Sequence, residues 1–136
     1  MEPDGPTDEA RLEALRWLST AQEDLHGAAA MLERDDVAPR LACFLAQQAA
    51  EKALKARLIG HGIAFPRIHD LLALRALLPA YESAGLDDAD LAEVSAWDVE
   101  ARYPGDLPEA TSADARTAFA DARAIIDTAR GDIAGG

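Results

Sequence analysis

The sequence of 136 residues is poor in aromatic and β-branched residues and contains a single cysteine. Phenylalanine, tryptophan and tyrosine together make up 5% of it, whereas alanine, leucine, arginine, aspartate and glutamate are abundant. Small and straight-chain residues lose little side-chain freedom in a helix, so this composition favours helices. We therefore predict an all-α protein, and the length predicts one domain.

Other absences limit where the protein is expected to work and what it is expected to bind. Cys43 is the only cysteine, so no intramolecular disulfide can form, which fits a reducing cytoplasm. The first six residues are acidic and lack the apolar run of a signal peptide. No apolar stretch approaches the roughly 20 residues that span a bilayer. We expect a cytoplasmic protein without a membrane partner.

Positive charge is also scarce, and it is unevenly distributed. The chain has 13 lysines and arginines against 25 acidic residues, and its net charge of −12 argues against binding to duplex DNA. Residues 40–75 nevertheless carry a net charge of +4, so the rest of the chain carries −16. This asymmetry indicates a functional surface within residues 40–75.

The spacing of apolar residues and the positions of capping residues predict five helices. Residues 1–6, with two prolines and a glycine, are expected to be disordered, and residues 7–133 to form a single domain. The predicted helices cover about 8–34, 39–60, 71–78, 88–101 and 112–133. Short connections imply an antiparallel bundle of four long helices with a short third helix packed across it. The apolar stripe of the first helix runs through Leu12, Leu15, Leu18, Leu25, Ala29 and Leu32.

The predicted helix over residues 39–60 does not separate polar from apolar residues cleanly. One face consists of alanines, which allow another helix to approach closely. The opposite side contains Gln47, Gln48, Glu51, Lys52 and Lys55, interleaved with Phe44, Leu58 and Ile59. This mixed side indicates partial burial, either against a second subunit in a two-fold symmetric homodimer or around a polar cleft. A solvated face with a Glu51–Lys55 pair is the alternative.

Two further motifs are candidates for a binding site. Arg102 suits a bidentate contact with phosphate and Tyr103 suits stacking on a base; alternatively, Arg102 caps the preceding helix and Tyr103 plugs the end of the bundle. His69-Asp70 has the residue types of a metal site, but no other suitable ligands are placed by a motif, and helix capping explains Asp70 better. The sequence has no glycine-rich phosphate loop and no nucleophile motif, so we expect no metal or other cofactor and assign no catalytic residue.

The segment from Cys43 to Leu71 resembles the HEPN family, named for higher eukaryotes and prokaryotes nucleotide-binding. The resemblance lies in Cys43-Phe44, the run Gln-Gln-Ala-Ala-Glu-Lys-Ala-Leu-Lys within residues 46–56, Gly62, Arg67 and His69-Asp70-Leu71. Further matches, including Arg102-Tyr103-Pro104, extend it from about Glu13 to Ile126. The resemblance implies a compact helical bundle that dimerises. Many prokaryotic members are encoded beside a minimal nucleotidyltransferase as toxin–antitoxin pairs, and others are metal-independent RNases.

The RNase branch of that family carries an arginine, then four to six residues, then a histidine. None of the three histidines of this sequence, His26, His61 and His69, follows an arginine at that spacing. Cleavage of RNA without a metal needs a general base and stabilisation of transition-state charge in a fixed geometry. We therefore predict little or no intrinsic RNase activity.

The resemblance and the charge pattern together imply a dimeric, nucleotide- or RNA-associated partner of a minimal nucleotidyltransferase. The surface expected to contact nucleotide, RNA or the partner protein comprises Gln48, Glu51, Lys52, Lys55, Arg67, His69, Arg102 and Tyr103. Its basic members are expected to converge on one concave surface. The alternatives are an RNase that uses Arg102 with a displaced histidine, and a dimerising scaffold without a ligand.

Overall fold

The computed structural model describes residues 7–79, 87–98 and 102–135. The helices are α1 (Asp8–Leu32), α2 (Pro39–Gly60), α3 (Leu71–Arg75), α4 (Asp88–Ser95) and α5 (Ser112–Gly135), and a 3₁₀ turn covers Pro104–Asp106. Within the described ranges there is no strand, and the predictions of an all-α class and of five helices are confirmed. The segment predicted to be disordered, residues 1–6, lies outside these ranges.

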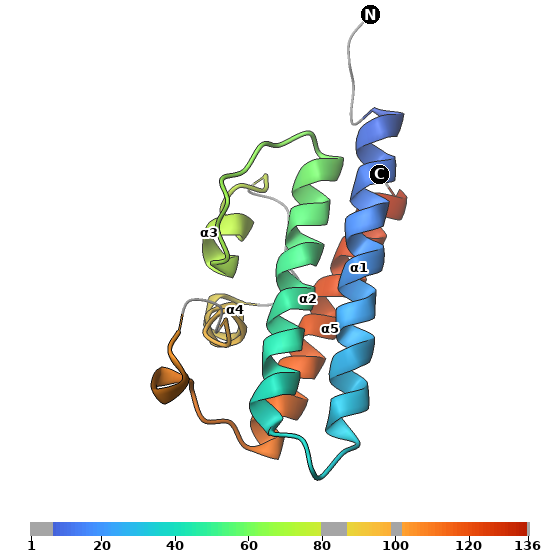
Figure 1. The fold of residues 1–136 in the computed structure, drawn as a ribbon. Coiled ribbons are helices and arrows are strands. Elements are labelled where there is room, and N and C mark those ends of the chain that lie inside the picture. The colour runs from blue at the N-terminus through green and yellow to red at the C-terminus, as the bar shows by residue number, and fades with distance from the viewer. Residues whose placement is uncertain (1–6, 80–86, 99–101, 136) are drawn as a thin grey trace, which may run out of the picture.

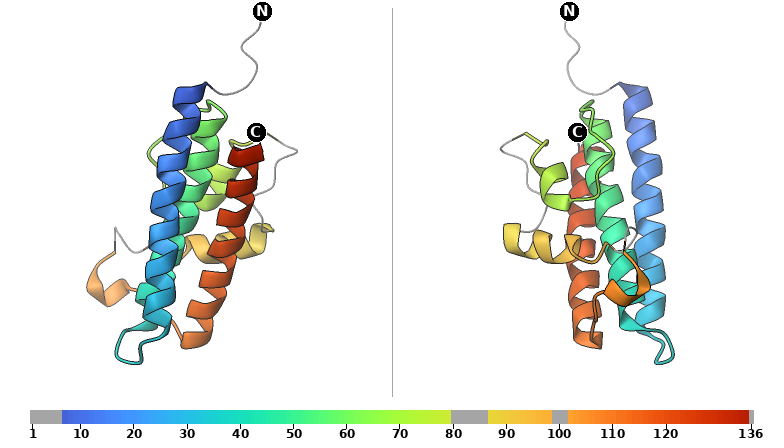
Figure 2. Two further views of the ribbon diagram at one scale, coloured as in Figure 1. Left: turned by 90° about the vertical axis from the view of Figure 1, so that its right-hand side faces the viewer. Right: turned by 60° about the vertical axis from the view of Figure 1, so that its left-hand side comes forward.

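Helix α2 is the centre of the bundle. Helices α1 and α5 lie along it, and α3 and α4 pack on its other flank (Figure 1 and Figure 2). The short connection over residues 33–38 makes α1 and α2 antiparallel (Figure 1). Because α2 contacts each of the other four described helices, its side chains meet neighbours on most sides.

The helix predicted over residues 88–101 is shorter than expected. Helix α4 ends at Ser95, and the N–H of Ala96 donates to carbonyls of the last turn. The C-terminal end of a helix carries partial negative charge, but α4 has no basic residue in its last turn, and Asp98 follows shortly after it. The described bundle therefore has three long and two short helices, rather than four long and one short. Residues 99–101 lie outside the described ranges.

Side-chain caps fix the starts of the long helices α1 and α5. The Thr7 hydroxyl accepts from the N–H of Ala10 at 3.0 Å, as expected of a cap for the first helix. Before α5, the Thr111 hydroxyl accepts from the N–H of Asp114 at 3.0 Å, and the Asp114 carboxylate accepts from the N–H of Thr111 at 2.9 Å. Gly62, with φ of 71°, closes the turn after α2 in a conformation that other residues rarely adopt.

Alanines fill the core around α2. Those of α2, all at most 2% exposed, are Ala42, Ala46, Ala49, Ala50, Ala53 and Ala56, and the buried residues of α1 are Ala14, Leu18, Ala21 and Ala28. Leu12 and Leu15 of the predicted stripe are instead 54% and 41% exposed. Small side chains let the two helices approach closely, and an added Cβ at Gly27 would lie 3.2 Å from Cδ1 of Leu45. Leu12 and Leu15 lie outside this contact, whereas Leu18 is buried in it.

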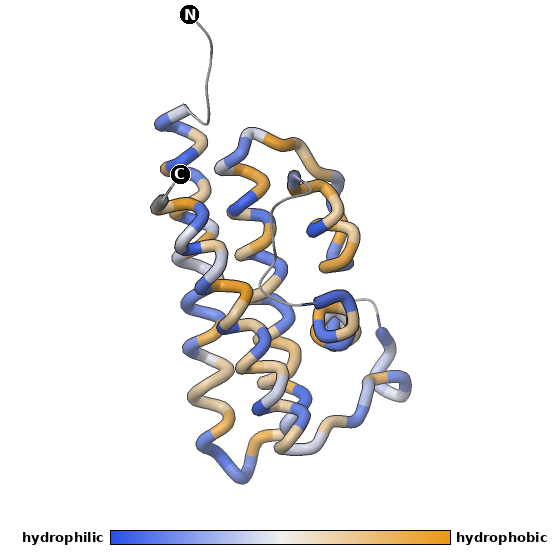
Figure 3. Tube along the Cα trace, turned by 180° about the vertical axis from the view of Figure 1, so that it is seen from behind, coloured by the Kyte–Doolittle hydropathy of each residue, from blue (hydrophilic) through white to orange (hydrophobic). Residues whose placement is uncertain are grey.

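Each long helix alternates between polar and apolar residues along its trace (Figure 3). Such alternation is typical of helices that bury one side and expose the other. None of the described helices combines the length and the apolar composition that a membrane crossing requires.

One carboxylate near α4 is unfavourably placed. Oδ2 of Asp121, on α5, is buried and has no hydrogen-bond partner among the described residues. Burial raises the pKa of Asp121, and the carboxylates of Asp90, Glu93 and Asp87 raise it further. The ionised carboxylate of Asp121 therefore destabilises the folded protein.

Replacing this carboxylate by an amide should stabilise the protein at neutral pH. Because the pKa of Asp121 lies above its ordinary value of 3.8 in the folded state, the wild type carries the penalty at neutral pH and loses it as the pH falls through the folded-state pKa. We expect Asp121→Asn to raise the melting temperature by roughly 2–5 °C near pH 7, with a smaller gain near pH 4. Asp127→Asn, at an exposed position of the same helix, is the control and should change little. Equal melting temperatures of wild type and Asp121→Asn at neutral pH would contradict this account.

Candidate functional site

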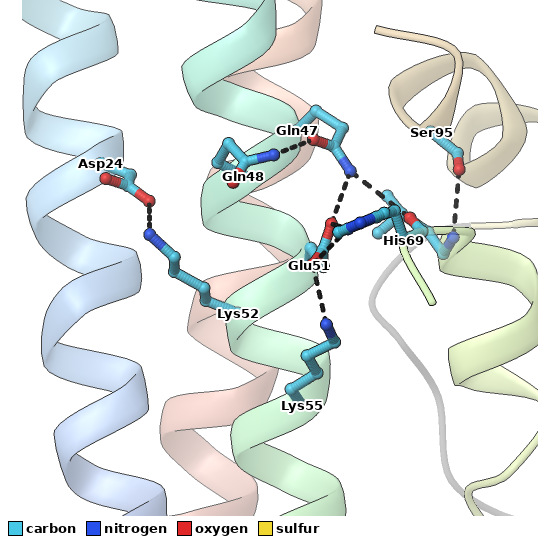
Figure 4. A network of polar contacts seen from close by, with 9 residues as sticks. Asp24, Gln47, Gln48, Glu51, Lys52, Lys55, His69 and Ser95 are labelled. Atoms are coloured by element: carbon cyan, nitrogen blue, oxygen red, sulfur yellow. Dashed lines mark hydrogen bonds and ion pairs between the residues drawn. The ribbon is translucent and has the colours of Figure 1, made fainter. Parts of the chain in front are cut away.

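The Glu51 carboxylate is the centre of a polar cluster on α2 (Figure 4). It accepts hydrogen bonds from Nζ of Lys55 at 2.9 Å and from Nε2 of Gln47 at 3.1 Å. Its two oxygens lie 3.1 and 3.0 Å from Nδ1 of His69. Gln47, Glu51 and Lys55 follow one another at intervals of four residues, which places their side chains on one face of the helix. The cluster thus joins this face of α2 to a histidine outside the helix.

His69 lies in the connection between α2 and α3, and its backbone is held from several sides. Its carbonyl accepts from Nε2 of Gln47 at 3.4 Å. The next residue, Asp70, caps the start of α3, as predicted. The N–H of Leu71 then donates to Oγ of Ser95 on α4 at 3.0 Å (Figure 4). Contacts with α2, α3 and α4 therefore fix the position of the imidazole.

The charges of this cluster are removed from water. Gln47, Glu51 and Lys55 are 0%, 5% and 6% exposed. Burial alone would raise the pKa of Glu51, but hydrogen bonds from its three neighbours, with Lys55 the strongest, outweigh burial and hold that pKa below its ordinary value. Glu51 is therefore ionised at neutral pH. Because an ionised carboxylate can only accept, Nδ1 of His69 carries the hydrogen of their bond.

Burial within a single chain accounts for the mixed side of α2. Residues of the connection after α2 cover this side: His69 contacts Glu51, and the ring centre of Phe65 lies 5.7 Å from the Lys55 ammonium. The predicted Glu51–Lys55 pair is present, but it is buried rather than solvated. No second subunit is required to cover this side, so homodimerisation remains a prediction that the mixed side does not support.

The structure brings part of the predicted site together. Glu51, Lys55 and His69 meet directly. Gln48 is linked to them, because its Nε2 donates to Oε1 of Gln47 at 2.7 Å. These residues form one continuous hydrogen-bonded group (Figure 4).

Lys52 lies apart from this group, on the side of α2 that faces α1 (Figure 4). Its Nζ atom is 2.6 Å from Oδ2 of Asp24. With Glu13, Arg16, Trp17 and Thr20, Lys52 lines a separate cavity of about 270 Å³. The prediction that Lys52 shares a surface with His69 therefore has no support from its observed contacts.

The remaining predicted residues lie at the surface. Arg67 is exposed and precedes His69 by two residues. The Arg102 guanidinium donates to the carbonyl of Ala96 at 3.4 Å, so it contacts the end of α4, as the capping alternative proposed. That end of α4 also binds the start of α3. Tyr103 is 79% exposed and does not plug the end of the bundle.

The net positive charge of residues 40–75 does not form a continuous basic surface. Four of its cations pair with carboxylates: Lys52 with Asp24, Lys55 with Glu51, Arg57 with Asp132, and Arg75 with Asp88. Arg57 is only 1% exposed, although it is an arginine. Arg40 and Arg67 form no ion pair with other described residues. Much of the asymmetry is therefore taken up by ion pairs, of which those of Lys52 and Arg57 join α2 to acidic residues of α1 and α5.

Two residues of the cluster were missed by the sequence prediction of the site. Gln47 lies four residues before Glu51, so helical spacing alone could have identified it. Ser95 contacts the start of α3 only because α4 packs there, and no local pattern indicates this. Within the described ranges, no group of three histidine, cysteine, aspartate or glutamate residues could hold a metal ion. Burial, with the charge of Asp114, raises the pKa of Cys43 to about 11, so it is a thiol at neutral pH.

Comparisons with known proteins agree on one family. The family model described as the HEPN domain matches residues 14–132. The crystal structure of TT1696 from Thermus thermophilus is similar, with a TM-score of 0.72 and 29% identity over 88% of this chain and 97% of that chain. The crystal structure of ST0689, described as an archaeal HEPN homologue, is also similar, with a TM-score of 0.68 and 28% identity over the same shares of the two chains. No curated protein gives a significant match.

Removing the charge of Glu51 should destabilise the fold. Glu51→Gln leaves the buried Lys55 ammonium without an ionised partner, and we expect it to lower the free energy of unfolding by about 2–4 kcal/mol. The pKa of Glu51 is depressed below its ordinary value of 4.5, so its stabilising contribution is present above that pH and is lost as the pH falls through the folded-state pKa. The difference between the two proteins should therefore shrink in acid.

Urea unfolding of both proteins at neutral and acidic pH measures this effect. Glu13→Gln is the matched control, because Glu13 also binds a basic residue and a ring nitrogen but lies on the exposed side of α1. The control should unfold close to the wild type. If Glu51→Gln unfolds at the same urea concentration as Glu13→Gln at neutral pH, the buried pair does not have the role assigned to it.

Proposed function

Because this chain belongs to the HEPN domain family, we propose that it is the nucleotide- or RNA-associated member of a two-component, toxin–antitoxin-like system. Its proposed protein partner is a minimal nucleotidyltransferase, and its proposed working form is a homodimer in the cytoplasm. HEPN domains often dimerise and bind nucleotides or RNA, and the match covers nearly the whole chain. The family membership is the starting point, and the specific role is what we propose.

The observation that carries the proposal is the clamped His69 at the edge of a buried polar cluster. Its side chain is 42% exposed, although Glu51 and Gln47 hold its ring and its backbone. Arg67 is exposed in the same connection, and its guanidinium has the geometry for a bidentate contact with phosphate. An imidazole held in place two residues from an exposed arginine can contribute to binding a ligand that carries phosphate groups.

The predicted site residues then divide into two groups. Arg67, His69, Arg102 and Tyr103 are the proposed ligand contacts, with the exposed Tyr103 ring available for stacking on a base. Glu51 is proposed to hold the His69 ring, with Lys55 and Gln48 in the hydrogen-bonded group around that carboxylate. Lys52 is left out of the ligand contacts, because its ammonium is bound to Asp24 on the opposite side of α2.

The proposed partnership can be tested with the gene next to the one that encodes this chain. If that neighbour encodes a short protein with a Gly-Ser…Asp-x-Asp nucleotidyltransferase motif, the tagged HEPN protein should retain it through affinity purification and size exclusion. The complex should contain at least two copies of this chain. An unrelated tagged protein of similar charge is the control. Elution of the two proteins as separate species at micromolar concentration would count against the partnership.

The protein should bind single-stranded RNA without cleaving it. The arginine-spaced histidine of the RNase branch is missing, and the Arg102 guanidinium is bound to a helix carbonyl, so its charge is not aimed at a reacting phosphate beside His69. We expect wild type, Arg102→Ala and His69→Ala to leave labelled RNA intact at the level of a buffer control. Robust cleavage by the wild type that either substitution abolishes would promote the RNase alternative. Cleavage unchanged by both substitutions would indicate contamination or a different site.

A further inference from the structure

We propose that the cavity between the start of α2 and the connection before α5 is a phosphate-binding subsite, in which Arg40 supplies the positive charge. The cavity adjoins Tyr103, so a bound nucleotide stacks its base on the Tyr103 ring and places its phosphate at Arg40. This inference rests on the proposed function, because it locates the phosphate of the nucleotide or RNA strand proposed above.

Two segments that are far apart in the sequence form the cavity. After the 3₁₀ turn, the chain runs past the start of α2 before it enters α5 (Figure 1 and Figure 2). Residues 38–40 line the cavity from one side, and Pro104 with residues 107–110 lines it from the other. Its volume is about 450 Å³, which lies within the range of sites for small ligands. Prolines and short apolar side chains make up most of its wall, and its charged lining residues are Arg40 and Glu109.

Arg40 is the cation of this cavity, and no described residue neutralises its charge. Its guanidinium forms no ion pair or hydrogen bond with another described residue, whereas four other cations of residues 40–75 pair with carboxylates. Glu109 also lines the cavity, but it is exposed and forms no ion pair with Arg40. The Arg40 guanidinium is therefore available for a bidentate contact with a phosphate in the cavity.

The position of Arg40 is electrostatically unfavourable for the fold itself. The N-terminal end of a helix carries partial positive charge, which acidic residues in the first turn offset. The other long helices have such residues, Asp8 and Glu9 in α1 and Asp114 in α5. The first turn of α2 has no acidic residue and no side-chain cap, and Arg40 adds a further positive charge to it. An anion bound in the cavity offsets both charges.

The cavity also adjoins a residue already proposed as a ligand contact. Tyr103 directly precedes Pro104, which lines the cavity, and its side chain is 79% exposed. A nucleotide carries an aromatic base and a phosphate, and these two groups match an exposed ring beside a cavity with an unpaired arginine. A contact with phosphate contributes affinity without reading the base. Arg40 is therefore assigned affinity for phosphate and no role in selecting a base.

Isothermal titration calorimetry with AMP and adenosine, which differ only in the phosphate, tests this assignment. Wild type should bind AMP about tenfold more tightly than adenosine, the effect of one charge-assisted contact. Arg40→Gln should abolish that preference and leave the affinity for adenosine unchanged. Arg123→Gln makes the same charge change at an exposed position of α5 that does not line the cavity, so it should keep the preference. Glu109→Gln should tighten the binding of AMP, because it removes a negative charge from the cavity wall.

Labelled single-stranded RNA without a terminal phosphate distinguishes two sources of the phosphate. If fluorescence anisotropy shows that Arg40→Gln also weakens the binding of this strand, the subsite takes a phosphate within the strand. If only the binding of AMP weakens, the subsite takes the terminal phosphate of a free nucleotide. Either result supports the subsite.

Thermal unfolding without ligand separates binding from a structural role of Arg40. Because Arg40 adds positive charge to the start of α2, Arg40→Gln should raise the melting temperature by about 1–3 °C. A lower melting temperature of Arg40→Gln would assign this arginine a structural role and overturn the inference.

The binding results also separate this inference from the proposed function. Equal binding of AMP and adenosine by the wild type, or a preference for AMP that persists in Arg40→Gln, overturns the subsite and leaves nucleotide binding by this protein intact. If the wild type binds neither AMP, adenosine nor the RNA strand, the proposed ligand and the subsite fail together.

Discussion

A carboxylate buried in a helical bundle must be paired, and in this protein the pairing of Glu51 determines how the chain continues after α2. Lys55 and Gln47 on the same helix satisfy part of the carboxylate, and His69 from the following connection satisfies more of it. Once His69 is held there, Asp70 stands at the start of α3 and the next N–H meets α4. This buried charge thus helps to order the connection, while Leu71 and Leu74 of α3 and Leu91 and Val94 of α4 bury the apolar sides of the two short helices. The energetic asymmetry matters here: a buried pair adds modest stability, but leaving either member alone is strongly unfavourable.

The long helices are held together differently. Small residues permit close packing, and ion pairs join the helices at the edges of their contacts. The alanine face of α2 is almost completely buried, so α1 and α5 approach near to its backbone. Basic residues at the edges of that face then reach acidic residues on the neighbours, as Lys52 does with Asp24 and Arg57 with Asp132. A basic central helix among acidic ones makes the fold electrostatically complementary within itself. The same feature leaves few cations for a ligand, so the proposed binding site depends on individual arginines rather than on a continuous basic surface.

Local rules predicted the parts of the fold that depend on local interactions. Pro39 and the turn around Gly62 bound α2, and Asp70 caps α3, because each acts through its own backbone or its nearest neighbours. The exposure of Leu12 and Leu15 was not predictable from periodicity, since it depends on how closely α1 approaches α2. In the site, the Glu51–Lys55 contact follows from helical spacing. The contact between Glu51 and His69 joins residues 18 positions apart and depends on the path of a connection, so the sequence only placed both among the candidates.

Binding and cleavage of RNA make different demands on such a site. Binding needs complementary donors, acceptors and charge in a fixed arrangement. Cleavage also needs a base and a cation aimed at the same reacting atoms, with geometry held through the transition state. The cluster around Glu51 supplies one rigid imidazole, but the nearby Arg102 contacts a helix carbonyl. Lys55 is turned toward the buried carboxylate rather than toward the surface. Two cations of the predicted site, Lys55 and Arg102, are thus bound to groups of the fold itself, so we expect this arrangement to favour binding over cleavage.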